Sequence, residues 1–226
     1  MRRLLALDTS TWWGSVALVE CSGDRVPQVV AEIGERVDDS HAERILDWIG
    51  RLLAEAGWSK TAVDAYAATR GPGSFTGVRV GLGTIRGLGL ASAKPCFGIT
   101  TLEAIAEAAG PSERHRLAVM DAGRGELYAA CFDARSSPPT EREPPWLASA
   151  PSVLERAVAD NCLVLQGPGT RIDPLYGLDP AALVAAPERL AGAAGCLACR
   201  RLDTDAGLFA PLYIRPPDAL LKRPRS

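Results

Sequence analysis

Three short polar segments of this 226-residue chain carry residue types that could do chemistry. One follows an apolar run near the N-terminus, one opens a turn between two apolar segments, and one flanks a proline after a later apolar run. Carboxylates in such places can hold Mg²⁺ and so position a bound nucleotide. Asp-Thr-Ser and Gly-Pro-Gly are also ordinary turn sequences, so each segment alone is weak evidence. The candidate residues are Asp8, Thr9, Ser10, Asp121, Gly167 and Gly169.

Other catalytic chemistries find little support. The two histidines, His41 and His115, lie 74 positions apart, and no HExxH zinc-peptidase motif is present. Cys196 and Cys199 form a lone CxxC with no second pair and no nearby histidine, so we interpret them as small residues on a helix face. The glycine turn at residues 71–73 is not followed by Gly-Lys-Ser/Thr, which argues against a Walker-type phosphate loop.

Composition limits the class of protein. With 47% apolar residues and a net charge of −2, the chain can bury a real core, as one domain or as two small lobes. A sequence pI near 5.8 without a block of basic residues argues against a surface that binds nucleic acid unaided. We expect the basic C-terminal residues, Lys222, Arg223 and Arg225, to be a disordered tail.

Two further features of the sequence indicate the cellular compartment of the protein. Asp8 interrupts the first apolar run after four residues, and no later segment approaches the length that spans a membrane. The six cysteines are scattered without framework spacing, which favours reduced, buried thiols. We therefore expect a cytoplasmic protein without a membrane partner.

Strands and helices are predicted to alternate along most of the chain. The first three strands form a meander, and the later alternation indicates βαβ units with parallel pairing. The composition of residues 135–145 predicts a surface loop. The predicted strands cover residues 3–7, 15–20, 29–35, 63–69, 96–99, 117–120, 127–132 and 163–166, and the predicted helices 42–56, 75–92, 101–110, 152–159, 181–184 and 188–201.

The helix predicted over 75–92 is rich in glycine. Each interior glycine costs roughly 1 kcal/mol against alanine, yet an aliphatic period persists through the segment. Gly77 with Gly81, and Gly83 with Gly87, are four residues apart and share a face, where a missing side chain lets another helix approach closely. We predict that this helix packs tightly against a partner; a poorly formed glycine-rich loop is the alternative.

The helix predicted over 42–56 has the complementary pattern. Ser40 and Glu43 match a capping box, and an apolar stripe includes Ile45, Ile49 and Leu53. Its other face is charged, which is typical of a solvated surface. His41 falls in the first turn, where a capping or surface role is expected rather than metal binding.

Several motifs together resemble one protein family. LALDTS, SHAERIL, GPGSFTGVRVG, GITTLEAIA and DAGRGELY fall within residues 1–130, and the match resumes at QGPG and PLYIRPPDA. They are similar to the bacterial TsaB (YeaZ) family, non-catalytic paralogues of TsaD in the synthesis of threonylcarbamoyladenosine (t6A) on tRNA. GPGSFTGVRVG is the most specific motif, and residues 135–161 carry little of the resemblance.

The resemblance implies a two-lobed α/β fold of the actin-like ATPase (ASKHA, ribonuclease-H-like) type, with a mixed sheet flanked by helices in each lobe. Residues 1–110 would form the N-terminal lobe with the partner-binding helices. Residues 111–226 would form the C-terminal lobe with a proline-rich basic tail. The six residues named at the outset would then be remnants of a nucleotide cleft that binds ATP or ADP and Mg²⁺ weakly, if at all.

The resemblance also implies a function without catalysis. TsaD binds its metal partly through two histidines, and the corresponding positions here are Thr101 and Ile105. Isoleucine offers no donor atom to a metal, so neither a catalytic residue nor a metal is expected. The chain would bind and activate TsaD, which modifies tRNA next to the anticodon. The alternatives are an active actin-like kinase or ATPase using Asp8 and Asp121, and the older M22 glycoprotease label.

Partners follow from the same resemblance. The chain would form a heterodimer with TsaD, join TsaE in a larger complex, dimerise with itself when alone, and meet tRNA only through the complex. Four charged residues could set the register of the helix contact, although a solvated face is their default interpretation: Arg44, Asp47, Arg79 and Arg86. The expected interface comprises Ala42, Ile45, Leu46, Ile49, Leu53, Gly77, Val78, Gly81, Leu82, Ile85, Gly87 and Leu88.

Overall fold

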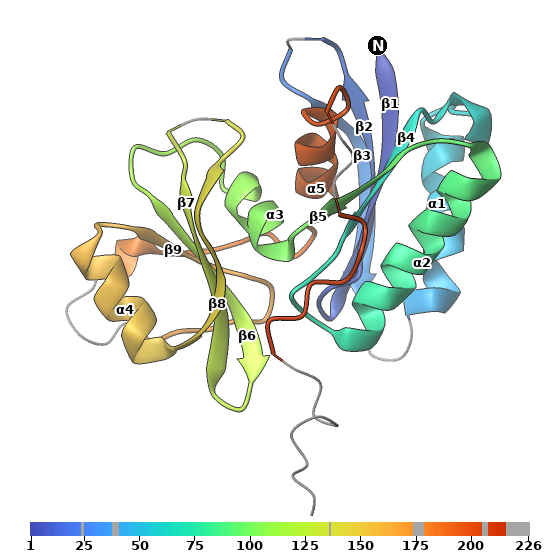
Figure 1. Ribbon diagram of the computed structural model, residues 1–226. Coiled ribbons are helices and arrows are strands. Elements are labelled where there is room, and N and C mark those ends of the chain that lie inside the picture. The colour runs from blue at the N-terminus through green and yellow to red at the C-terminus, as the bar shows by residue number, and fades with distance from the viewer. Residues whose placement is uncertain (24, 38–40, 136, 174–178, 205–207, 216–226) are drawn as a thin grey trace, which may run out of the picture.

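The chain folds into two lobes, each built on a five-stranded sheet (Figure 1). The computed structural model describes all residues except 24, 38–40, 136, 174–178, 205–207 and 216–226. The expected capping residue Ser40 and the basic tail therefore lie outside the described residues, as do the side chains of residues 41–43.

The first sheet has the strand order β3-β2-β1-β4-β5. Strands β1 to β3 form an antiparallel meander, while β4 runs parallel to β1 and β5 parallel to β4. The interior strand β4 is buried along its whole length, as expected for a strand with both faces covered. The strands are β1 Arg2–Asp8, β2 Trp13–Cys21, β3 Gln28–Arg36, β4 Ala65–Thr69 and β5 Cys96–Ile99.

The second sheet repeats this arrangement, with the order β10-β9-β6-β7-β8. Strands β6 to β8 form the meander, and β9 and β10 continue in parallel from β6. Two mixed sheets of the same topology make the two-lobed actin-like (ASKHA) fold, and that prediction is confirmed. The strands are β6 Arg116–Gly123, β7 Glu126–Asp133, β8 Thr140–Ser149, β9 Leu163–Gln166 and β10 Leu183–Ala185.

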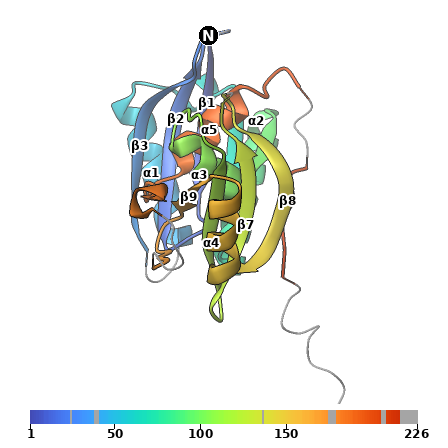
Figure 2. The same ribbon diagram turned by 90° about the vertical axis from the view of Figure 1, so that its left-hand side faces the viewer.

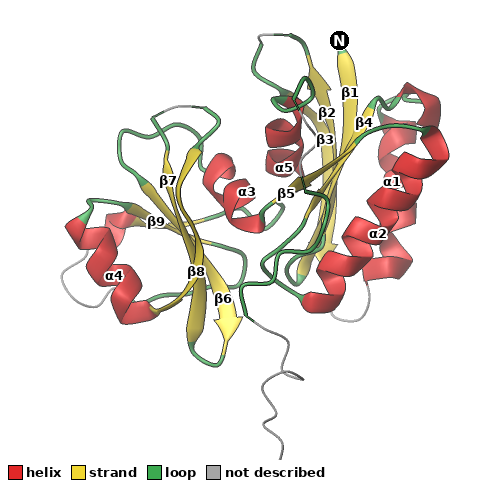
Figure 3. Ribbon diagram, in the orientation of Figure 1, coloured by secondary structure: helices red, strands yellow, loops and turns green. Residues whose placement is uncertain are grey.

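The helices form an outer and an inner layer (Figure 3). Helices α1 and α2 lie side by side on the outer face of the first sheet, α4 covers the outer face of the second, and α3 and α5 lie between the sheets. Short 3₁₀ turns occur at Lys60–Ala62 and Pro180–Ala182. The helices are α1 His41–Glu55, α2 Phe75–Ser92, α3 Thr101–Ala108, α4 Ala150–Ala159 and α5 Ala191–Cys199.

The two inner helices are exchanged between the lobes. Helix α3 follows the last strand of the first sheet but packs against β6, β7 and β9, whereas α5 follows the second sheet and packs against β1, β2 and β4. The two helices also contact each other, as the view from the side of the second lobe illustrates (Figure 2). One apolar cluster includes Leu4, Phe97, Ile105, Leu165 and Leu197, so the lobes share a core.

Polar and covalent contacts fasten the exchanged helices. Arg201 donates a 2.6 Å hydrogen bond to Glu103, and Arg200 pairs with Glu107. A disulfide joins Cys21 at the end of β2 to the last residue of α5. The expectation that all six cysteines are reduced is therefore wrong for Cys21 and Cys199, because sheet and helix, 178 residues apart in sequence, bring them together.

Most predicted elements appear at their expected positions, but two segments differ. Residues 135–145, predicted as a loop, contribute to β8, an edge strand in which Pro144 and Pro145 fall between the paired residues Glu143 and Trp146. An edge strand tolerates prolines at such an irregularity because no second neighbour needs their N–H groups. Residues 181–184, predicted as a helix, contain the end of a 3₁₀ turn and the start of β10.

Candidate functional site

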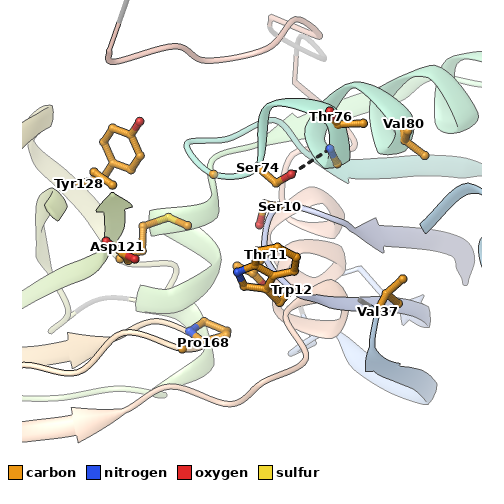
Figure 4. Close-up of a pocket in the computed structure, with 15 residues that line it drawn as sticks. Ser10, Thr11, Trp12, Val37, Ser74, Thr76, Val80, Asp121, Tyr128 and Pro168 are labelled. Carbon is orange, nitrogen blue, oxygen red and sulfur yellow. Dashed lines mark hydrogen bonds between the residues drawn. The ribbon is translucent and has the colours of Figure 1, made fainter. Parts of the chain in front are cut away.

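A pocket of about 380 Å³ lies between the lobes (Figure 4). The first lobe contributes the β1–β2 loop with Ser10 and Trp12, together with Ser74 at the start of α2. The second lobe contributes Asp121 from the end of β6 and Gly169 from the loop after β9. The polar segments identified in the sequence are thus brought to one place by the fold.

Asp8 ends β1 and is completely buried. One carboxylate oxygen, Oδ1, accepts hydrogen bonds from the Ser10 N–H at 3.0 Å, the Ser10 hydroxyl at 2.6 Å and the Thr69 hydroxyl at 2.6 Å. Asp8 therefore shapes the loop that forms the pocket wall, and it does not itself line the pocket.

Glycines at the start of α2 let this loop sit against the helix. Thr9 donates a 2.7 Å hydrogen bond from its hydroxyl to the carbonyl of Gly77. A Cβ atom on Gly77 would overlap the carbonyl oxygen of Thr9, and one on Gly81 would overlap the Thr9 hydroxyl. Ser74 caps the helix by accepting a hydrogen bond from the Gly77 N–H. The neighbour that requires glycine at 77 and 81 is thus the protein's own loop, and not the partner helix expected from their spacing.

The opposite wall is held by a hydrogen bond between the end of β6 and the loop after β9. The backbone N–H of Asp121 donates to the Thr170 hydroxyl at 2.9 Å, and its carboxylate accepts a 2.8 Å hydrogen bond from the N–H of Gly123. Gly169 has a φ of +77°, which favours glycine in this turn. A Cβ on Gly167 would lie 2.7 Å from Cδ1 of Ile105, so Gly167 supports the wall from behind.

The charge of the lining bears on which ligand it can take. Asp121 is the only charged residue among the described residues that line the pocket. Polyphosphates are usually held by cationic side chains as well as by backbone N–H groups, and Mg²⁺ needs carboxylate oxygens. Because Asp8 does not line the pocket and no lysine or arginine lines the described walls, these residues do not fit a magnesium–polyphosphate group.

Metal-binding chemistry finds no support elsewhere. Thr101 and Ile105 are both completely buried in α3, and Ile105 packs in the shared core. Within the part of the chain that the structure describes, no group of three or more His, Cys, Asp or Glu residues could hold a metal ion.

Several pocket residues were not singled out from the sequence. Trp12 is 66% exposed, and Val37, Tyr128 and Pro168 belong to the apolar part of the lining. The signal available was the Trp12-Trp13 pair in a polar loop, since a large exposed aromatic side chain in a loop is itself a candidate contact residue.

The second candidate site is the outer surface of α1 and α2. Most of the expected interface residues pack between these helices and the first sheet, and Leu88 is partly buried there. Leu46, which is 64% exposed, and Gly87 lie on the surface, while the side chain of Ala42 lies outside the described residues. The residues buried in the lobe's own core are Ile45, Ile49, Leu53, Val78, Leu82 and Ile85.

Beside exposed charged residues such as Arg44, Asp47 and Arg86, the outward surface of the two helices includes positions occupied by glycine or by a single exposed leucine, which together we call the outer helix face. On α1 it comprises Leu46 and Gly50, and on α2 it comprises Gly83, Gly87 and Leu90. A Cβ atom on any of the three glycines would meet no atom within 4 Å, and Leu90 is 78% exposed. These glycines therefore relieve no clash inside the described protein.

The four charged residues expected beside the contact have partners within the chain. Arg44 pairs with Glu35 of β3, and Arg51 approaches Asp47 at 3.9 Å. Arg79 stacks on Phe75, and Arg86 donates a 3.4 Å hydrogen bond to a backbone carbonyl further along the chain. These pairs lie on exposed side chains, where each contributes little to stability.

None of the described helices is both long enough and apolar enough to cross a membrane.

Comparison with known proteins gives three findings. The family model for TsaD, tRNA N6-adenosine threonylcarbamoyltransferase, matches residues 30–135. A Haemophilus influenzae protein named tRNA threonylcarbamoyladenosine biosynthesis protein TsaB is 43% identical over 129 residues, covering 55% of this chain and 51% of that protein. The solved structure of YeaZ from Pseudomonas aeruginosa has a TM-score of 0.71 and 28% identity, covering 94% of this chain and 100% of that one.

Similarity also extends along the whole chain. An uncharacterised protein of Mycobacterium tuberculosis is 30% identical over 222 residues, which is 96% of this chain and 93% of that protein. The TsaB of Escherichia coli is 40% identical over 130 residues. The chain spans about half the length of the curated TsaB relatives it matches, 51% and 54% respectively for the two named here.

Proposed function

The chain belongs to the TsaB (YeaZ) family, and from this premise we propose that it acts in the synthesis of t6A on tRNA as a subunit that binds and activates a TsaD protein. The reaction on the tRNA, next to the anticodon, is carried out by the partner. In this proposal the chain works in the cytoplasm, meets tRNA only within the complex, and shares the larger assembly with TsaE.

The observation that carries the proposal is the outer helix face. Exposed glycines at Gly83 and Gly87 each cost roughly 1 kcal/mol of helix stability, and no contact within the described protein requires them. A helix from another chain that approaches to backbone distance would explain why side chains are missing there. Packing two helices against two buries on the order of 1,500 Å², a standard size for a specific interface.

A catalytic role for the chain itself is less well supported. Thr101 and Ile105, both buried, occupy the positions that correspond to the metal-binding histidines of TsaD, and isoleucine offers no donor atom to a metal. The interlobe pocket lacks cationic lining among its described residues. We therefore propose that the chain has no transferase activity and that the pocket is the remnant of a nucleotide cleft.

The interface is tested by adding bulk to the outer helix face. Gly87→Leu should reduce co-purification with TsaD at least tenfold and leave the far-ultraviolet circular dichroism of the chain unchanged, because the site is open in the isolated protein. Gly87→Ala should reduce binding less. A matched control is Glu155→Leu on the exposed side of α4.

Unchanged complex formation by Gly87→Leu would contradict this placement of the interface. Catalysis is tested separately by calorimetry with ATP and Mg²⁺ and by a tRNA-modification assay of the chain alone. Turnover in either experiment would overturn the non-catalytic part of the proposal while leaving the interface untouched.

A further inference from the structure

Residues 208–215, which we call the strap, run along the first lobe and end on the second (Figure 1). The backbone N–H of Leu212 donates a 2.7 Å hydrogen bond to the carbonyl of Arg70. A Cβ on Gly98 would lie 2.7 Å from the carbonyl oxygen of Leu208, and one on Gly71 2.8 Å from that of Leu212. The strap therefore lies directly against the backbone of β5 and of the start of the Gly-Pro-Gly turn.

The strap has an anchor on the first turns of α2. The guanidinium of Arg79 lies 3.5 Å from the centroid of the Phe75 ring, and its Nε donates a 2.8 Å hydrogen bond to the hydroxyl of Tyr213. The rings of Phe75 and Tyr213 are 5.4 Å apart. The cation–π contacts of an arginine with two aromatic rings, and the contact between the rings, stabilise the position of the strap on α2.

A second anchor, at Arg215, attaches the strap to the second lobe. Arg215 donates a 2.9 Å hydrogen bond to the carbonyl of Ala122 and forms an ion pair with Glu126. The arginine side chain is 17% exposed, so this contact is better shielded from water than the surface pairs of α1.

The two anchors adjoin the two walls of the interlobe pocket. Phe75 lies between Ser74 and Thr76, which line the pocket from the first lobe, and Ala122 lines it from the second (Figure 4). The lobes are also joined by α3, α5 and the core that these helices share. We propose that the strap is a clasp that fixes the distance between the pocket walls, so that releasing Arg215 loosens the pocket while the shared core stays intact.

A strap that merely covers the surface makes a different prediction. In that case its release would increase the mobility of residues 208–215 and of the hairpin at residues 121–128, which Arg215 contacts directly at Ala122 and Glu126. A clasp couples the two walls, so its release should also be felt in the loop at residues 10–13, which lies on the opposite wall. The inference stands independently of the proposed role with TsaD.

Hydrogen exchange followed by mass spectrometry on the full chain separates these cases. Arg215→Ala should raise the exchange rate about tenfold in residues 10–13 and 121–128, which is what the loss of a partly buried, charge-assisted contact permits. Arg86→Ala is the matched control, because Arg86 contacts only the part of the strap that lies on its own lobe, at Phe209. It should leave both pocket walls unchanged.

A second, milder variant tests whether the effect of Arg215→Ala comes from the ion pair and not from general destabilisation of the fold. Glu126→Gln removes the charge of the ion pair and keeps the shape of the side chain, and it should raise exchange about threefold in the same two segments. Exchange that rises only in residues 208–215 and 121–128, or a loop at residues 10–13 that responds no differently from strand β4, would overturn the clasp.

Discussion

The two lobes share one sheet topology but differ in what covers it. In the first lobe, the connections between β3 and β4 and between β4 and β5 are the helices α1, of 15 residues, and α2, of 18 residues. In the second lobe, the corresponding connections are α4, of 10 residues, and a segment whose described part contains only a 3₁₀ turn. The difference teaches that one scaffold serves two purposes: the first lobe presents a broad helical surface, and the second completes a pocket.

The largest effect is expected from a test of the two faces of α2, which compares a glycine that faces the protein's own loop with one that faces solvent. Gly81→Leu should destabilise the protein by about 3 kcal/mol or more, because its side chain would collide with Thr9 of the adjoining loop. Chemical denaturation measures the loss. Gly83→Leu, on the open side of the same helix, serves as the control. Equal losses for both variants would contradict the division into two faces.

The exchange of helices between lobes can be tested through the disulfide. Cys21→Ser should lower stability by about 2–4 kcal/mol, since the bond closes a loop of 178 residues between the first sheet and α5. For a chain of this size the melting temperature should fall by about 5–12 °C. A reductant should destabilise the unmodified protein and leave the variant unaffected. If the reductant lowers both melting temperatures alike, another cysteine is responsible.

A smaller effect is expected at the ion pair between α3 and the end of α5. Burial acts to raise the pKa of Glu103, but the charge and hydrogen bond of Arg201 and the N–H of Thr100 outweigh it, so the pKa lies below its ordinary value. A depressed pKa stabilises the fold above the ordinary value and loses that contribution as the pH falls through the lowered one.

Glu103→Gln should therefore cost about 1–3 kcal/mol at neutral pH, and its deficit should shrink at pH values below 4.5. Urea denaturation at several pH values measures this. A deficit that stays constant down to pH 3 would mean that the carboxylate charge does not join the lobes. Glu155→Gln on the exposed side of α4 is a control within the second lobe.

The smallest expected effect is a gain in the stability of the isolated chain. Gly87→Ala should stabilise the isolated chain by about 0.5–1 kcal/mol, because alanine favours the helix and meets no atom within 4 Å. Thermal unfolding of dilute protein measures it. A loss of stability in its place would mean that the outer helix face is already covered, for example by a second copy of the chain.

Local patterns in the sequence were sufficient to predict where many helices and strands lie, but not what each of their faces contacts. Helix α2 spans the predicted residues 75–92 because its cap at Ser74 and its aliphatic period are both local signals. The spacing of Gly77 and Gly81 is the same as that of Gly83 and Gly87, so spacing alone could not show that the first pair faces Thr9 and the second faces solvent.

Long-range features were the ones that the sequence did not disclose. The pairing of Cys21 with Cys199 depends on α5 crossing to the other lobe, which no periodicity encodes. The prolines of β8 suggested a loop, because their tolerance depends on the strand lying at a sheet edge. Within the pocket, the sequence identified Ser10, Asp121 and Gly169, whereas Asp8, Thr9 and Gly167 proved to be supports.

The crossing of α5 has a consequence for synthesis on the ribosome. When the first five strands have emerged, the face of their sheet that α5 later covers is still exposed, because residues 191–199 follow both sheets in the chain. The apolar surface of the nascent first lobe must therefore stay open to chaperones until the second sheet and α5 have been translated. For the same reason, neither lobe should be obtainable as a soluble, folded fragment.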